Sequence, residues 1–178
     1  LFRRGNHSKI TFSMMYAFSE YYVLPISHDE VVHGKKSLLD RFPGLYGQKF
    51  DGMRAFLIYM MTHPGKKLLF MGCENGQFTE WNYETEVEWF LLDYEQHKKL
   101  HAFVRDLNRL YLAHSELWEA DDSWDGFEWL EPDLKELNII SFRRMDRDGN
   151  ELVIVMNFAP VERKGFAVDG LGHPRYNE

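Results

Sequence analysis

Acidic and imidazole side chains follow directly after a short apolar run near the start of the chain. The run at residues 22–26 stops at Ser27, and His28, Asp29 and Glu30 come next. Buried parallel strands are near-continuous apolar runs, and in barrel enzymes the residues just past a strand's C-terminal end carry the chemistry. Carboxylate and imidazole groups are common proton-transfer groups of active sites. Packing explains this cluster poorly, so His28 and Asp29 are candidate catalytic residues.

Asp29 also has a purely structural interpretation, because an aspartate at a helix start can cap the first turn through its side-chain oxygen. From residue types alone, this interpretation is as good as the catalytic one. Two better-known motifs fail on spacing. His28 and His33 are five positions apart, whereas two zinc-binding histidines on one helical face need a spacing of four. Residues 34–37 resemble a phosphate loop but lack its upstream glycine and its hydroxyl residue directly after the first lysine.

A second candidate segment spans residues 70–81, Phe-Met-Gly-Cys-Glu-Asn-Gly-Gln-Phe-Thr-Glu-Trp. Glycine just past a strand end lets the backbone approach a ligand closely. Glu74 and Gln77 can bind hydroxyl groups of a ligand, and the Trp81 ring can cover an apolar face of the same ligand. The structural alternative is a solvated loop in which Trp81 fills the rim of a barrel. For each residue taken singly, the two interpretations are equally good.

The elements that must position these residues follow from apolar periodicity. Residues 10–20 favour a short helix, and residues 22–26 and 66–71 favour strands. Between the strands, one helical face should carry Met53, Phe56, Leu57, Met60 and Met61, and the helix should stop at Pro64-Gly65. A strand, a helix and a strand joined by short connections predict parallel pairing. A later helix should bury Leu100, Phe103, Val104, Leu107, Leu110 and Tyr111.

Helical periodicity disappears beyond Leu117. Short β-type runs cover residues 127–130, 138–143 and 152–158, and residues 148–150 are typical of a hairpin turn. The late aromatic residues suggest starch binding, but aromatic side chains also dominate ordinary cores. We therefore expect core packing for Trp118, Trp124, Phe127, Trp129 and Phe142.

Composition narrows the class of protein. The 178 residues are 44% hydrophobic and 16% aromatic, which excludes disorder. A net charge of −7 argues against a nucleic-acid partner. The one cysteine, Cys73, excludes an intrachain disulfide, fits a reducing compartment, and is expected to be inert. No apolar run is long enough to cross a bilayer and no signal peptide is apparent, so we expect no membrane partner and a cytoplasmic location.

Taken together, these motifs resemble the 1,4-α-glucan (glycogen) branching enzymes of the α-amylase superfamily, glycoside hydrolase family 13. The resemblance extends over nearly the whole chain and rests most on His28-Asp-Glu-Val-Val-His-Gly-Lys-Lys36 and Gly126-Phe-Glu-Trp-Leu130. It implies an α/β fold that is the C-terminal part of a (β/α)8 TIM barrel, followed by the start of an antiparallel all-β domain. We expect residues 1–115 to be the last part of the barrel, around strands seven and eight, and residues 116–178 to begin a C-terminal β-sandwich.

The same resemblance implies a function for the full-length protein in glycogen biosynthesis. A branching enzyme cleaves an α-1,4-glucan and transfers the chain to a 6-hydroxyl with retention, through a glycosyl-enzyme intermediate. The family pattern assigns Asp29 the role of transition-state stabiliser and His28 a hydrogen bond to the same sugar. It assigns substrate binding to Glu74, Gln77 and Trp81. It implies no cofactor and no metal.

The nucleophile and the acid/base residue of the family lie on earlier barrel strands. The resemblance therefore implies that they belong to a missing N-terminal part of the same polypeptide, and that this segment alone is inactive. One departure is Asn75, which stands where the family carries an apolar residue. Two alternatives stay open: another superfamily hydrolase, of the amylase or debranching type, and a non-catalytic glucan-binding remnant.

Overall fold

Two short parallel strands and two long helices make up residues 22–114. In a computed structural model that describes residues 4–171 and 176, β1 (Val23–Ile26) leads through a loop into α2 (Tyr46–Thr62), and β2 (Lys66–Leu69) follows. The strands pair in parallel, with Val23 opposite Lys66 and Ile26 opposite Leu69. This confirms the parallel pairing that the sequence predicts. The carboxyl ends of both strands, and the loops that follow them, therefore lie at the same edge.

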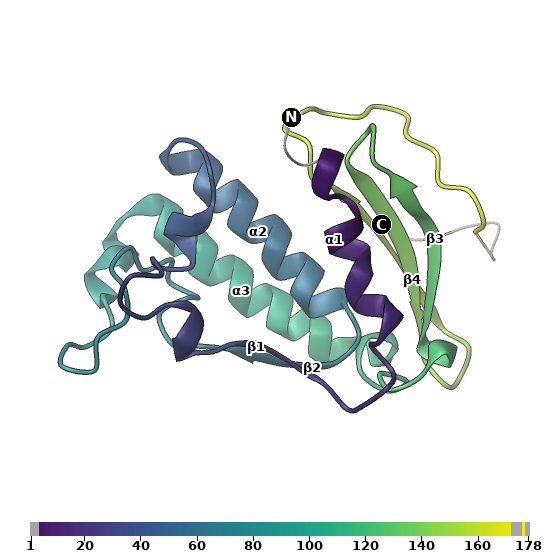
Figure 1. Cartoon of the computed structure of the whole chain (residues 1–178), viewed down its shortest axis with the longest axis horizontal. Helices are drawn as coiled ribbons and strands as arrows, with labels where there is room; N and C mark the ends of the chain where they lie inside the picture. The colour runs from purple at the N-terminus through teal and green to yellow at the C-terminus, as the bar shows by residue number, and fades with distance from the viewer. Residues whose placement is uncertain (1–3, 172–175, 177–178) are drawn as a thin grey trace. The chain divides into compact units, whose positions relative to one another are not determined.

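The helices α2 and α3 (Glu95–Ala113) lie side by side, with the β1–β2 pair along one side of them (Figure 1). Their facing side chains form the core of this part. Four residues of the predicted apolar face of α2 are buried: Met53, Leu57, Met60 and Met61. Leu100 and Val104 of α3 are buried in the same core. Leu110 was expected on the buried face of α3 but is 42% exposed. It lies in the last turn of α3, where its neighbour Tyr111 packs against the core instead.

Three antiparallel strands form the second sheet. They are β3 (Phe127–Leu134), β4 (Ile139–Met145) and β5 (Glu151–Asn157), in the order β3-β4-β5. The central strand β4 pairs with both neighbours and is buried over most of its length. The turn between β4 and β5 contains Gly149 at a φ of 85°, a conformation that favours glycine. The three β-type runs and the hairpin turn predicted from the sequence are confirmed.

The late aromatic residues divide into two groups. Phe127 and Phe142 are buried and stack with ring centroids 5.2 Å apart, while Trp129 packs on both rings. Core packing is confirmed for these residues. Trp124 is 55% exposed and Trp118 is 38% exposed, so the expectation of core packing is wrong for them. Both precede the strands, where no alternating pattern directs a side chain inward.

The first residues contact the β3-β4-β5 sheet. They form the short helices η1 (Arg4–Asn6), α1 (Ser8–Thr11) and η2 (Phe12–Met15) in place of the single helix expected at 10–20. The buried His7 ring lies with its Nε2 2.8 Å from the carbonyl oxygen of Pro132 in β3. Phe18 packs edge-on against Trp124. The chain thus divides into two units: residues 22–114, and the residues up to Tyr21 together with those from Ser115 onward.

The remaining elements are short 3-10 helices: η3 (His28–Glu30), η4 (Leu39–Arg41), η5 (Trp89–Asp93), η6 (Ser115–Leu117) and η7 (Trp124–Gly126). In the part of the chain that the structure describes, none of the helices has the length and apolar character needed to cross a membrane.

Candidate functional site

The predicted acid–imidazole cluster lies where β1 ends, on the short helix η3. Ser27 begins this helix, and its Oγ accepts a hydrogen bond from the backbone N–H of Asp29 at 3.2 Å. The Glu30 carboxylate accepts hydrogen bonds from the Ser27 backbone N–H and hydroxyl, both at 2.7 Å. The Ser27 hydroxyl lowers the pKa of Glu30 because it stabilises the charged form. Ser27 and Glu30 form a capping box, so the cap that Asp29 could have provided is supplied by Ser27.

The side chains of His28 and Asp29 are open to a ligand. Their exposed fractions are 53% and 69%, and His28 Nε2 lies 3.4 Å from Asp29 Oδ1. The Trp81 ring packs edge-on against the His28 ring with centroids 5.8 Å apart, and also against Phe70. The structure thus brings together three of the five predicted site residues: His28, Asp29 and Trp81. This cluster offers a carboxylate, an imidazole and an aromatic ring at the carboxyl end of a parallel strand.

The Gln77 side chain is hydrogen-bonded within its own loop. Its Oε1 accepts a hydrogen bond from the Glu88 backbone N–H at 3.3 Å, and its Nε2 donates to Thr79. A Cβ placed on Gly72, whose φ is 86°, would lie only 2.8 Å from Gln77 Oε1. Glycine at this position therefore lets the Gln77 amide pack against the backbone. In this structure Gln77 stabilises the loop that follows β2.

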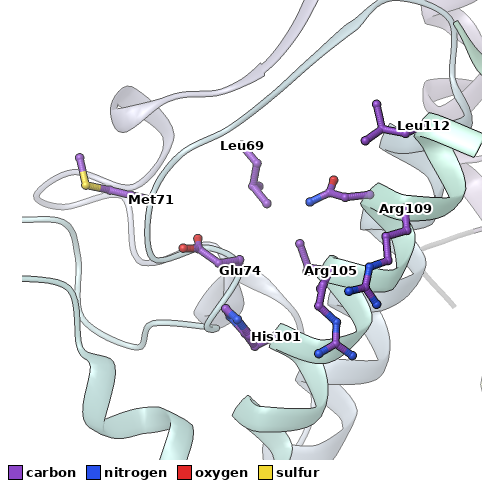
Figure 2. Close-up of a pocket in the computed structure, with 9 residues that line it drawn as sticks. Leu69, Met71, Glu74, His101, Arg105, Arg109 and Leu112 are labelled. Carbon is purple, nitrogen blue, oxygen red and sulfur yellow. The ribbon is translucent and has the colours of Figure 1, made fainter.

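Glu74 lines a cavity of about 660 Å³ between β2 and α3. Figure 2 shows Glu74 and Met71 on the loop after β2, and His101, Arg105 and Arg109 along α3. His28 and Asp29 are not among the residues that line this cavity. The structure therefore does not bring Glu74 into the His28–Asp29–Trp81 cluster.

Asn75, which is expected to depart from the family pattern, is fully buried and binds two histidines of α3. His101 Nδ1 lies 2.7 Å from the Asn75 side-chain oxygen, and His97 Nδ1 lies 2.8 Å from its backbone oxygen. Because both oxygens can only accept, each imidazole donates. These bonds fix the loop after β2 to α3 through both Asn75 oxygens, while the buried Asn75 Nδ2 has no hydrogen-bond partner among the described residues. The neighbouring Cys73 is buried, and burial raises the pKa of its thiol to about 12, which agrees with the expectation of an inert cysteine.

Sequence reasoning did not single out Glu80. Its two carboxylate oxygens accept hydrogen bonds from the backbone N–H groups of Gly34, at 2.9 Å, and Lys36, at 2.7 Å. These two donors lower the pKa of the Glu80 carboxyl. Trp81, the next residue, donates its backbone N–H to the Val31 carbonyl at 2.8 Å. The partners are 44 and 46 positions away from Glu80 along the chain, so no local sequence pattern could have revealed them.

Comparison with known proteins identifies relatives over the whole chain. The chain is 52% identical, over its full length, to the 1,4-alpha-glucan branching enzyme GlgB of Halothermothrix orenii, and covers 28% of that protein. It is 53% identical to GlgB of Desulfitobacterium hafniense, over 93% of this chain and 26% of that one. For GlgB of Aquifex aeolicus the identity is 50%, over 94% of this chain and 27% of the relative. The chain therefore spans little more than a quarter of the length of these curated relatives.

Among solved structures, a cyclomaltodextrinase resembles this chain with a TM-score of 0.54 and 25% identity. The match covers 77% of this chain and 21% of that one. No protein-family model matches the chain.

Proposed function

Since this chain is a homologue of the 1,4-α-glucan branching enzymes over its whole length, we propose that it is a segment of such an enzyme and contributes to its active site. The complete protein then cleaves an α-1,4-glucan and transfers the released chain to a 6-hydroxyl of a second glucan. The observation that carries this proposal is the identity of about half of all residues across the whole chain.

The fold supports a barrel origin for residues 22–114. Strand, helix, strand and helix follow one another in β1, α2, β2 and α3, with parallel strands and both helices packed together. This is the repeating unit of a (β/α)8 barrel, in which catalytic residues lie at the carboxyl ends of strands. The three antiparallel strands β3, β4 and β5 then belong to the start of a C-terminal β domain. The likeness to a cyclomaltodextrinase supports this assignment.

The proposed roles follow from the chemistry of retaining glycosyl transfer. Positive charge develops on the sugar ring in the oxocarbenium-like transition state. The exposed Asp29 carboxylate stabilises this charge and binds sugar hydroxyl groups, and His28 donates a hydrogen bond to the same sugar. Trp81 packs against His28 and borders the space that the sugar occupies. The nucleophile and the acid/base residue come from elsewhere in the polypeptide, so the segment alone is inactive.

The other two predicted binding residues, Gln77 and Glu74, have smaller roles in substrate binding. Gln77 reaches substrate by way of a water molecule or after it releases the Glu88 N–H, because its amide is hydrogen-bonded within the loop. Glu74 contacts glucan only where a chain enters the cavity beside α3. Substitution of either residue is therefore expected to affect turnover less than substitution of Asp29.

A hybrid enzyme tests the proposal. This segment replaces the homologous part of the Halothermothrix orenii enzyme, and the hybrid should form branches without increasing the number of reducing ends. Asp29→Asn should lower its kcat by about 10²–10³-fold, the usual effect of removing one transition-state contact, with a smaller effect on glucan binding. Asp93→Asn, at an exposed carboxylate of the same unit, is the matched control. Near-normal turnover of the Asp29 variant would refute its role, and a rise in reducing ends would indicate hydrolysis.

A further inference from the structure

The loop after η3 has a backbone conformation that needs outside support. Gly34 and Lys36 both have positive φ values, 83° and 68°. Glycine adopts positive φ readily, but for Lys36 it is uncommon, and a non-glycine residue persists there where the surroundings hold it. The N–H groups of these two residues converge on one carboxylate, that of Glu80. Hydrogen bonds from N–H groups to an ionised carboxylate are among the strong ones in proteins, so Glu80 holds this loop in its unusual conformation.

The same loop fixes the position of His28 and Asp29. It begins at Val31, directly after η3, and the Val31 carbonyl accepts a hydrogen bond from the Trp81 N–H at 2.8 Å. Arg41 adds a second connection, because its guanidinium donates to the carbonyl groups of Glu30 and Lys35. Movement of the loop would therefore displace the C-terminal end of η3. The capping box holds this end only through the Glu30 side chain, and the backbone that follows it depends on the contacts to Trp81, Glu80 and Arg41.

We propose that Glu80 is a positioning residue for the His28–Asp29 pair. It acts through the backbone of residues 31–36 and does not touch the substrate. Together with the Trp81 N–H and ring, it makes the loop after β2 the support that holds the loop after β1 in its active geometry. The proposal rests on the function proposed above, because it requires Asp29 to act at the reacting sugar. It adds a residue outside the cluster that the sequence predicts.

The chemistry of the contact suits a fixed support. The backbone N–H groups of Gly34 and Lys36 hold the pKa of Glu80 low, so the carboxyl is ionised near neutral pH and has no proton to donate. His33 Nδ1 lies 3.6 Å from Glu80 Oε2, and the His33 side chain is fully exposed. Glutamine at position 80 retains the length of the side chain but offers one acceptor oxygen in place of two. One of the two N–H groups would then face an amide NH₂.

The test uses the hybrid enzyme with Glu80→Gln, Glu80→Asp and the control Glu84→Gln. Glu84 is an exposed carboxylate of the same loop, so its substitution makes the same change of charge. A displacement of about 1 Å at a reacting group can lower the rate by about 10²-fold. We expect Glu80→Gln to lower kcat by about 10- to 100-fold with KM changed by less than about twofold, the pattern of a lost transition-state interaction. Glu80→Asp should retain more activity, and Glu84→Gln should match the unsubstituted hybrid.

Amide hydrogen exchange supplies a readout that does not depend on activity. Exchange in peptides covering residues 31–37 should be faster in Glu80→Gln than in Glu84→Gln. Unchanged exchange would show that Glu80 does not hold the loop. Faster exchange with unchanged kcat would show that the loop does not position His28 and Asp29. A lower kcat with unchanged exchange would indicate direct contact with substrate. Each of these results overturns the proposal. A hybrid that forms no branches before any substitution overturns the proposed function instead, and exchange then decides whether Glu80 sets the loop.

Discussion

Replacing Arg144 should destabilise the β3-β4-β5 sheet far more than replacing its neighbour Arg143. The Arg144 side chain is fully buried. Its Nε donates to the Gly126 carbonyl at 2.9 Å, and its guanidinium donates to the Asp121 carboxylate, also at 2.9 Å. The Asp121 side chain is only 6% exposed. Arg144→Met would thus leave a carboxylate and a carbonyl group buried without these donors.

The expected magnitude follows from this burial. Breaking a buried ion pair by removing one partner costs about 3–5 kcal/mol, because the remaining charge is uncompensated. Arg143 lies next to Arg144 on β4, and so its side chain points to the other face of the sheet. It pairs with Glu128, which is 51% exposed, and with Glu151, which is 9% exposed; its own side chain is 19% exposed, so solvent reaches the guanidinium, unlike that of Arg144. Partly exposed pairs contribute about 1 kcal/mol or less. Arg143→Met is therefore the matched control: the same substitution, one position away in the same strand.

Native-state amide hydrogen exchange of β4 measures the difference. Since about 1.4 kcal/mol corresponds to a factor of ten, Arg144→Met should accelerate exchange of the slowest β4 amides by at least about 10²-fold. Arg143→Met should change exchange by less than about tenfold. A double variant, Arg144→Met with Asp121→Leu, should recover part of the loss, because a buried ion pair replaced by apolar groups is often close to neutral. Equal effects of the two single variants, or no recovery in the double variant, would refute the assignment.

Two further predictions concern the part of the protein that contains this sheet. A Cβ added to Gly126 would lie 1.8 Å from the Ala120 carbonyl oxygen, so Gly126→Ala should lower the free energy of unfolding by about 3 kcal/mol or more. The control is Gly5→Ala, which has no atom within 4 Å of the added Cβ and should change the free energy of unfolding by less than about 0.5 kcal/mol. Similar amide exchange rates in the two variants would contradict this account. Burial alone would raise the pKa of the Asp146 carboxyl, but hydrogen bonds from Asn150, Ser115 and Asp148 outweigh it and lower the pKa below its ordinary value of 3.8. The stabilisation from Asp146 is therefore complete above pH 3.8 and is lost as the pH falls through the lowered pKa of the folded state. When the free energy of unfolding is measured against pH, its fall at acid pH should be less steep for Asp146→Asn than for the unsubstituted protein. An unchanged fall at acid pH would contradict the direction of the pKa shift.

The sequence by itself located the two long helices, the strands and the place of the candidate site, but not the short helices before residue 16. Apolar spacing in α2 fixed which face is buried, because a helix brings residues three and four positions apart onto one side. Short apolar runs located β1 and β2, and turn-forming residues located the hairpin between β4 and β5. The acid–imidazole motif after β1 could be recognised in the sequence because its residues are consecutive. In each case the pattern depends only on residues close together in the chain.

The tertiary structure decided which residues support that site. It packed Trp81 edge-on against the ring of His28, and it brought the Glu80 carboxylate within hydrogen-bonding distance of the Gly34 and Lys36 N–H groups. It directed Glu74 to a cavity beside α3 and joined Asn75 to two histidines of that helix. These contacts depend on how two loops from neighbouring parallel strands meet at one edge of the sheet. A carboxylate that accepts hydrogen bonds from backbone N–H groups more than forty positions away leaves no periodic or local signature, because its partners are defined by the fold and not by their side chains.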